Sequence, residues 1–402
     1  MPRSKSSRPF KSDTTVIHAG QDRARNSGIV NTPVFHASTV VFDSMAALSA
    51  ASEKVLKQRE KGLFYGRRGT PTHWTLQEAI TEMEGGADTV LAASGLNACT
   101  TAILGCVKAG DHLLMVDSVY EPTRVFCDKF LTSYGVETTY YPAGVGAGIS
   151  ALMRPNTTAV FCESPGSHTF EMQDLPAIAA AAHKNGAKVL VDNTWASPLF
   201  CQPLKLGCDV SIQAATKYVV GHSDAMLGTI CCNDAALDGV FRAASLLGVV
   251  VGPDDVYLAT RGLRTLAVRL RQHEQNALKV ARWLQRQPQV KRVLFPALPD
   301  DPGYALWKRD CSGASGLLGV VFHRTSAEAV TAMIDGMDLF ALGYSWGGFE
   351  SLIAPSSPGK SRTAEAWTEP VPGVRLHIGL EDADDLIADL SAGFARFSAA
   401  LG

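Results

Sequence analysis

A lysine and an aspartate occupy positions in this sequence where side chains often do chemistry. Lys217 follows the apolar run 210–214, which is typical of the end of a buried strand, and Asp192 ends the earlier run 188–191. Burial disfavours the charged form of an amine, so a lysine at a strand end can act as a nucleophile near neutral pH. A solvated loop lysine is nevertheless the commoner case. The interpretation of Lys217 therefore depends on its neighbours.

The pairing of these two side chains indicates a specific cofactor. An amine at one strand end can hold an aldehyde covalently, and a carboxylate at the next strand end can keep a pyridine nitrogen protonated. Pyridoxal phosphate requires both groups. The sequence therefore predicts a pyridoxal phosphate site that contains Lys217 and Asp192.

A second candidate feature is a turn that could bind a phosphate. A short apolar run at 89–92 leads into residues 94–97 (SGLN), and a helical pattern follows over 98–107. The first N–H groups of a helix have no intrahelical partner and the helix dipole is positive there, so this unit is suited to an anion. The turn lacks the lysine and the glycine spacing of a Walker loop. Alone, the signal is weak.

Three further segments carry residues that could bind a cofactor or an amino-acid substrate. Tyr120 follows a strand-like run. Arg375 lies on the run 374–379, with His377 on the same face and Leu376 facing the core. A rigidly held arginine is a good receptor for a carboxylate, although a structural ion pair is equally expected. The loop 64–73 carries two arginines and an aromatic residue, and a basic surface turn is the simpler interpretation there.

Alternating strand-like and helical segments predict a parallel sheet that positions these residues. The expected strands cover 112–116, 137–141, 159–161, 188–191 and 210–213. Ligands of such sheets bind beyond the carboxyl ends of the strands, so Tyr120, Asp192 and Lys217 are expected in one cleft.

The rest of the chain predicts a second, smaller unit. A long amphipathic helix over 256–287 is expected to lead into alternating strands and helices, in which 343–348 forms a glycine-flanked aromatic loop. The glycines at 144–148 lack the spacing of a dinucleotide fingerprint and predict a flexible loop.

The bulk properties exclude several classes of protein. The chain has 402 residues, 46% of them hydrophobic and 19% charged, as in a globular protein of two or three lobes. A net charge of −2 gives no general attraction to nucleic acid, and no apolar run reaches the ~20 residues of a membrane helix. Nine cysteines without Cys-x-x-Cys spacing predict no metal site and no disulfide framework. We expect a cytoplasmic protein with a disordered basic tail over the first eleven residues.

Together these segments resemble the Cys/Met-metabolism family of pyridoxal phosphate enzymes, of fold type I. The resemblance extends from about residue 15 to residue 397. Nine stretches in the family's order carry it: FYGRRGTPTH at 64–73, YEP at 120–122, ESPG at 163–166, VDNTW at 191–195, SIQAATKY at 211–218, GHSDA at 221–225, RGLRTL at 261–266, YSWGG at 344–348 and RLHIGLED at 375–382.

The resemblance implies a role for each residue around the cofactor. Lys217 would hold the cofactor, remove the substrate Cα proton and protonate the departing sulfur. Asp192 would pair with the pyridinium nitrogen, and Tyr120 would stack on the ring; Tyr120 and Tyr65 are also catalytic candidates. The phosphate would be held, largely through backbone N–H groups, by Ser94, Gly95, Leu96 and Thr216.

The resemblance also implies an assembly and a domain plan. Tyr65 and Arg67 would reach the phosphate of a neighbouring subunit in a homotetramer with shared sites. The plan is an N-terminal arm (1–62), a cofactor domain with a mostly parallel seven-stranded sheet (63–256) and a C-terminal α+β domain (257–402). Two positions depart from the family pattern. Ala214 stands where many relatives have a serine, which removes one phosphate contact, and only the backbone of Leu96 is carried over.

The reaction that the resemblance implies is β-elimination from a small sulfur amino acid. L-Cystathionine would give homocysteine, pyruvate and ammonia in methionine synthesis, and cysteine- or cystine-type substrates are also expected. The substrate carboxylate would bind Arg375, Ser345 and the backbone of Trp346, beside Tyr344. Trp346 favours β-elimination, because γ-acting relatives tend to carry a smaller residue there. The alternatives are a cysteine desulfhydrase, a γ-lyase, a γ-synthase-like transferase or, against the complete residue set, a non-catalytic binding protein.

Overall fold

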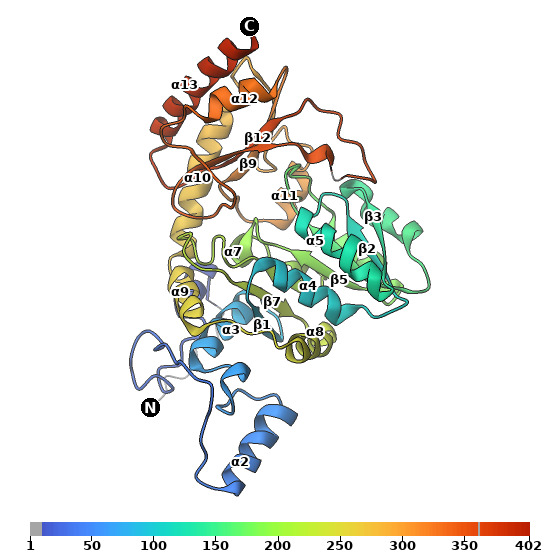
Figure 1. Ribbon diagram of the computed structural model, residues 1–402, viewed down its shortest axis with the longest axis vertical. Helices are drawn as coiled ribbons and strands as arrows, with labels where there is room; N and C mark the ends of the chain where they lie inside the picture. The colour runs from blue at the N-terminus through green and yellow to red at the C-terminus, as the bar shows by residue number, and fades with distance from the viewer. Residues whose placement is uncertain (1–9, 361) are drawn as a thin grey trace.

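The computed structural model describes residues 10–360 and 362–402, so most of the predicted basic tail lies outside the described residues. Figure 1 shows a body of two sheets, with helix α2 (Met45–Ser52) at one end of the molecule and the C-terminal helix α13 (Ala383–Leu401) at the other. In this part of the chain no helix is long and apolar enough to cross a lipid bilayer.

The larger sheet has seven strands in the order β1-β7-β6-β5-β4-β2-β3. β7 pairs antiparallel with β1 and β6, and the other pairs are parallel. The strands are β1 (Asp88–Ala92), β2 (His112–Val116), β3 (Glu137–Tyr141), β4 (Thr157–Glu163), β5 (Lys188–Asp192), β6 (Val210–Gln213) and β7 (Gly228–Cys232). The predicted mostly parallel seven-stranded sheet is confirmed. Strand β4 is longer than predicted at both ends.

Helices cover this sheet because its strands are apolar on both faces; all five residues of β2, for example, are buried. Helices α4 and α8 contact each other and β7, and α6 packs on β4 and β5. The helices of this part are α3 (Pro71–Glu84), α4 (Gly95–Cys106), α5 (Glu121–Val125), α6 (Leu175–Lys184), α7 (Ser197–Phe200) and α8 (Asp234–Leu247).

The smaller sheet has five strands in the order β10-β11-β12-β9-β8, antiparallel except for the β10–β11 pair. Its strands are β8 (Val290–Leu294), β9 (Leu317–Phe322), β10 (Ala341–Leu342), β11 (Leu352–Ser356) and β12 (Gly373–His377). The helices of this part are α9 (Pro253–Leu263), α10 (Leu266–Leu284), α11 (Tyr304–Asp310), α12 (Ala327–Ile334) and α13. Figure 1 shows α10 running from the larger sheet to the smaller one. Residues of α3, α9 and α10 share one hydrophobic core with the smaller sheet.

The single helix predicted over 256–287 is wrong, because the structure breaks it into α9 and α10. Gly262 lies against the carbonyls of Val219 and Val220, where a Cβ atom would come within 2.4 Å of both oxygens. The Arg264 side chain bonds to the carbonyls of Val16 and Ala19, each at 2.9 Å. These tertiary contacts stop the helix at residues 264–265, and neither is visible in the periodic pattern.

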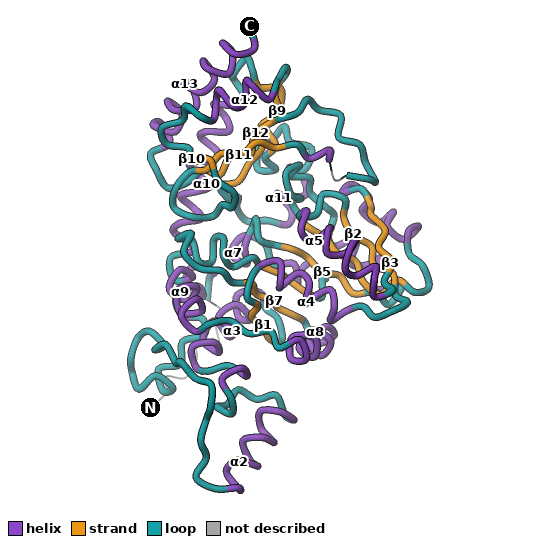
Figure 2. Tube along the Cα trace, in the orientation of Figure 1, coloured by secondary structure: helices purple, strands orange, loops and turns teal. Residues whose placement is uncertain are grey.

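Two other local expectations need correction. Helix α3 begins at Pro71, inside the predicted loop 64–73, because Thr70 is the N-cap residue of this helix. The N–H of Thr70 bonds to His73 Nδ1 at 3.2 Å. The glycines at 144–148 do not form a flexible loop; Ala143–Leu152 forms short 3-10 turns with one kink at Gly146. Figure 2 shows how much of the chain between the strands is loop.

The N-terminal arm contains two helices with little shared core. Helix α1 (Ser12–His18) buries only Val16, and α2 buries no residue. Short helical turns complete the secondary structure: Glu53–Lys57, Gly66–Arg68, Phe126–Phe130, Leu131–Tyr134, Ala143–Leu152, Pro203–Leu206 and Pro358–Lys360.

Candidate active site

The amine of Lys217 lies at the meeting point of the two sheets. Strand β6 ends at Gln213, and the turn that follows carries Lys217 away from the sheet. Its Nζ bonds to Ser345 Oγ at 2.6 Å and lies 5.4 Å from the ring centre of Trp346. Burial, and then the charge of Arg375, lower the pKa of Lys217 to about 8, against the opposing effect of Asp192. The residue is thus a buried amine and not a solvated loop lysine.

Asp192 ends the neighbouring strand, β5, and keeps some accessible surface. Its Oδ1 accepts hydrogen bonds from the hydroxyl and the N–H of Thr194. Among the described residues, Oδ2 receives only a weak contact from Cys99 Sγ at 3.6 Å. Burial raises the pKa of Asp192, and the Thr194 bonds oppose this rise. One carboxylate oxygen is therefore left for a further donor.

Thr194 connects the two predicted residues, and the sequence reasoning missed it. Besides its bonds to Asp192, its Oγ1 accepts a hydrogen bond from the N–H of Ala214 at 2.8 Å. Ala214 starts the turn that leads to Lys217. One buried hydroxyl thus fixes the carboxylate relative to the lysine turn. Its place in the VDNTW stretch was the available signal.

The start of α4 has the cap geometry of the predicted anion site. Ser94 is the N-cap, and its Oγ accepts from Asn97 N at 3.1 Å. Gly95 and Leu96 are the first helical residues, whose N–H groups have no intrahelical acceptor. A Cβ atom on Gly95 would lie 2.4 Å from Ala214 Cβ. The helix start can therefore approach the lysine turn only because residue 95 is glycine and residue 214 is small.

Thr216 lies in the same turn, but its hydroxyl is already engaged. Its Oγ1 accepts from Leu227 N at 2.9 Å and donates to Leu227 O at 3.2 Å. These bonds fix the orientation of the hydroxyl. Thr216 is thus adjacent to Lys217 in the sequence and is bonded to the residue that precedes β7.

Tyr120 is held through its backbone by a residue that the sequence reasoning did not select. Its N–H bonds to Glu163 Oε2 at 2.7 Å, and the residue is 45% exposed. Glu163 ends β4 and stands in register beside Asp192 of β5. Burial and the nearby Asp192 charge raise the pKa of Glu163. The signal for Glu163 was its position at the end of a strand, in the stretch ESPG.

The smaller sheet contributes the predicted substrate residues. Arg375 of β12 lies 3.5 Å from the carbonyl of Ser345, and burial lowers its pKa. Ser345 adopts a φ of +96°, a conformation that costs a residue other than glycine about 1–3 kcal/mol. The structure brings Arg375, Ser345 and Trp346 to Lys217. Tyr344 is 85% exposed, and the described chain gives it no contact with the lysine.

His377 is buried, although the strand pattern placed it with Arg375 on the face opposite Leu376. Its Nε2 lies 3.2 Å from Gly347 N and 3.0 Å from Gly348 O. Its ring centre lies 6.1 Å from that of Tyr218 and 5.2 Å from that of His273. The face carrying His377 is covered by the 343–348 loop and by the residue after Lys217, so both faces of β12 are packed.

Tyr65 and Arg67 are not brought to Lys217 within this chain. Tyr65 pairs with Thr39 of the arm and is 44% exposed. Arg67 donates to the carbonyl of Ser245 at 3.3 Å, near the end of α8. In the described chain neither residue contacts Lys217 or Asp192.

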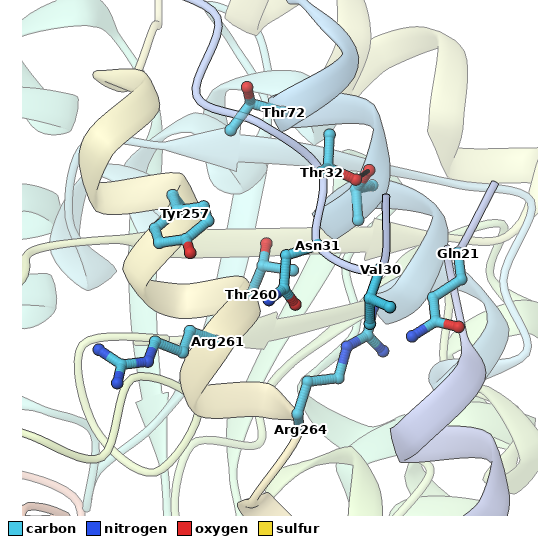
Figure 3. Close-up of a pocket in the computed structure, with 10 residues that line it drawn as sticks. Gln21, Val30, Asn31, Thr32, Thr72, Tyr257, Thr260, Arg261 and Arg264 are labelled. Atoms are coloured by element: carbon cyan, nitrogen blue, oxygen red, sulfur yellow. Dashed lines mark hydrogen bonds between the residues drawn. The ribbon is translucent and has the colours of Figure 1, made fainter. Parts of the chain in front are cut away.

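A separate pocket lies between the arm and the α3–α9 pair (Figure 3). Tyr257, Thr260 and Arg261 of α9 form one side, and residues of the arm, including Val30 and Asn31, form the other. None of its ten lining residues is one of the predicted site residues. This pocket is therefore not the catalytic candidate.

The residues around Lys217 fit pyridoxal phosphate. The lysine supplies a buried amine, Asp192 keeps an oxygen for a protonated ring nitrogen, and α4 presents N–H groups that suit a phosphate. The exposed ring of Tyr120 provides a flat apolar surface beside them. Each requirement of the cofactor is met by a different element.

Known proteins resemble this chain over almost its whole length. It is 48% identical to a putative cystathionine β-lyase of Rhizobium johnstonii over 391 residues, which covers 96% of each chain. It is 47% identical to cystathionine β-lyase MetC of Escherichia coli over 393 residues, which covers 96% of this chain and 98% of the relative.

The fold also matches that of a solved enzyme, a cystathionine γ-synthase. The crystal structure of cystathionine γ-synthase from Xanthomonas oryzae superposes with a TM-score of 0.88 at 33% identity, covering 98% of this chain and 100% of the other. Residues 13–395 match the family described as Cys/Met metabolism PLP-dependent enzymes. The chain therefore belongs to this family, and its cofactor is pyridoxal phosphate.

Proposed function

We propose that this enzyme cleaves the β-carbon–sulfur bond of L-cystathionine and releases homocysteine, pyruvate and ammonia. The observation that carries the proposal is the contact between the buried Lys217 amine and the Ser345–Trp346 loop. Arg375 in turn lies 3.5 Å from the carbonyl of Ser345, which supports Lys217 as the base and Arg375 as the carboxylate receptor. The identity of 47–48% to cystathionine β-lyases supports the choice of substrate.

Each residue of the site has a task in this reaction. The cofactor, when bound, withdraws electrons from the substrate α-carbon. Lys217 takes the proton from that carbon and returns a proton to the departing sulfur, which its pKa of about 8 permits near neutral pH. Asp192 holds the positive charge on the cofactor ring. Arg375 and Ser345 bind the substrate carboxylate and orient the β-carbon toward Lys217.

The cofactor phosphate is assigned to two chains. Ser94, Gly95, Leu96 and Thr216 would hold it from one side, largely through backbone N–H groups, and Tyr65 and Arg67 of a neighbouring copy would hold it from the other. The separation of Tyr65 from Lys217 supports a shared site in a homotetramer. Exposed apolar residues of the arm, including Val41 and Met45, would be covered by such an assembly. We place the enzyme in the cytoplasm, where its nine free cysteines remain reduced.

A γ-acting enzyme is the second candidate, because a cystathionine γ-synthase shares the fold at 33% identity. The same lysine and carboxylate residues serve both reactions. Trp346, which lies beside Lys217, is the residue that favours β-cleavage, because the family resemblance implies a smaller residue at this position in γ-acting enzymes.

A product assay on L-cystathionine tests the proposal. The protein should be yellow, lose its colour on borohydride reduction, and produce pyruvate and homocysteine. Formation of 2-oxobutyrate and cysteine would instead assign it as a γ-lyase. Lys217→Ala should reduce turnover at least a thousandfold, about 4 kcal/mol of barrier. Full activity in that variant would contradict the whole scheme.

A further inference from the structure

Cys201 and Cys311 face each other where the two sheet-based parts of the molecule meet. They form an isolated antiparallel pair that joins the residue after α7 to the residue after α11. Their own N–H groups bond back into α7 and α11, at 3.1 and 2.8 Å, while Ser312 N bonds to Phe200 O at 2.8 Å. The pair is therefore of the non-hydrogen-bonded kind, in which Cα atoms lie about 4.5 Å apart and side chains approach most closely.

This geometry suits a disulfide. Bridged cysteines have Cα separations of about 4.4–6.8 Å. When the two Cα atoms lie within this range and the Cβ atoms face each other, a disulfide can form without movement of the backbone. Both residues are free thiols. The contact is tight, because a Cβ atom on Gly313 would lie 2.6 Å from the Phe200 ring. The two chain segments therefore hold the thiols in place.

The two thiols differ in a way that divides their roles. Cys201 is 4% exposed, whereas Cys311 is only half-buried. The hydrogen bond with Cys311, and then burial, raise the pKa of the Cys201 thiol. Cys201 is therefore held as a thiol. The Cys311 sulfur is the more accessible of the two, so it is the one that an oxidant reaches first.

We propose that Cys201 and Cys311 form a reversible disulfide when the enzyme meets a peroxide. The Cys311 thiolate attacks hydrogen peroxide, becomes a sulfenic acid and releases hydroxide. The Cys201 thiol then attacks the sulfenic sulfur, so that a disulfide forms and water leaves. Overall, two thiols lose two hydrogen atoms and peroxide is reduced to two waters. A thiol reductant reverses the reaction.

The disulfide would link the segment that follows Asp192 covalently to the C-terminal part of the molecule. Asn193, the residue after Asp192, donates through Nδ2 to the carbonyl of Cys201 at 3.0 Å. The disulfide would thus fix the segment that follows the carboxylate against the segment that precedes β9. It would also trap the sulfenic acid before further oxidation, since a resolving thiol lies directly opposite. Transient bridges of this kind are the ones that occur in reducing compartments.

Peptide mapping of the holoenzyme without reduction tests the proposal. After hydrogen peroxide, the wild type should yield one cross-linked Cys201–Cys311 peptide pair that dithiothreitol separates. In Cys201→Ser the bridge cannot form, so Cys311 should gain two oxygen atoms as the sulfinic acid. Cys106→Ser, which changes the other half-buried cysteine, should leave the cross-link intact. Absence of the cross-link in the wild type, or equal over-oxidation of Cys311 with and without Cys201, would overturn it.

Thermal unfolding gives a second readout that is independent of activity. The oxidised wild type should unfold a few degrees above the reduced enzyme, because the bridge closes a long loop between the two parts. Cys201→Ser should show no such increase after peroxide. An unchanged unfolding temperature in the cross-linked wild type would show that the bridge does not clamp the parts together.

Discussion

At the scale of single residues, the amine of Lys217 is activated by its surroundings. Burial is the largest cause of its pKa of about 8, and the nearby Arg375 charge adds to it. At neutral pH about a tenth of such an amine is unprotonated, compared with far less than a hundredth for an ordinary lysine. Lys217 Nζ donates a hydrogen bond to Ser345 Oγ at 2.6 Å, and this bond orients the amine. Reactivity here follows from the position of the side chain.

This pKa predicts how fast the apoenzyme captures its cofactor. Only the neutral amine attacks the cofactor aldehyde, so the capture rate should rise with pH up to about 8 and then level off. Rapid-mixing absorbance measurements at constant ionic strength, from about pH 6 to about pH 11, would follow the capture rate. Lys217→Ala should bind the cofactor without any borohydride-reducible label. A rate that continues to increase beyond pH 10 would show an ordinary lysine.

Thr194 offers a test of how Asp192 is positioned. Thr194→Val keeps the shape but leaves the Ala214 N–H without its acceptor and removes a donor to Asp192. An unsatisfied buried donor costs about 1–3 kcal/mol, so the urea midpoint should fall, and turnover should fall with it. Thr194→Ser keeps the hydroxyl and should restore both quantities. Wild-type stability and rate in the valine variant would remove Thr194 from the site.

At the scale of elements, the site exists because several strands end at one edge of the sheet. Glu163 and Asp192 end adjacent parallel strands in register, and the Lys217 turn follows the next strand. Ser94 follows β1, which runs in the same direction because β7 is antiparallel to both of its neighbours. The topology therefore gathers residues that are far apart in the sequence.

The helix start at residue 95 is the element most sensitive to a single methyl group. In Gly95→Ala, the new Cβ would collide with Ala214, so α4 must shift away from the lysine turn. Such overpacking costs about 1–3 kcal/mol, and cofactor affinity should fall about tenfold or more. Equilibrium titration of the apoenzyme measures it. Leu96→Ala, a change of an exposed side chain next to it, should leave the affinity unchanged, because the proposed phosphate contact of this residue uses only its N–H.

Sequence patterns predicted where the helices and strands lie more accurately than they predicted where these elements end and what they contact. The strands were predictable because fully buried parallel strands read as short apolar runs, and Lys217, Asp192 and Arg375 stood out as charges at or on them. Thr194 and Glu163 were not selected, because their roles depend on which strands lie side by side. The break at residues 264–265 depends on contacts with distant carbonyls, which periodicity does not contain.

At the scale of the whole molecule, the N-terminal arm packs little against the rest of its own chain. Helix α2 buries no residue and stands away from the two sheets in Figure 1. Val41, in the segment that precedes this helix, is 88% exposed. Apolar surface of this kind is costly in a monomer and is expected to be covered in an assembly. The loop that carries Tyr65 and Arg67 follows directly, so the assembly and the cofactor site would be completed together.

A mixing experiment decides whether the site is shared between chains. Lys217→Ala and Arg67→Glu should each be nearly inactive, since one lacks the base and the other repels the cofactor phosphate. If Arg67 serves its neighbour's lysine, a mixed dimer contains one site with both changes and one with neither. Co-refolding equal amounts should then recover about a quarter of wild-type activity.

The matched control uses two residues that already meet within one chain. Asp192 and Lys217 influence each other's pKa in the same chain, so each subunit contributes both of them to one site. Mixing Lys217→Ala with Asp192→Asn should therefore recover nothing, because every site keeps one defect. Recovery in the Arg67 mixture alone would assign that arginine to the neighbouring site. Failure in both mixtures, with mixed oligomers verified by mass, would confine the site to a single chain and leave Arg67 a structural contact of α8.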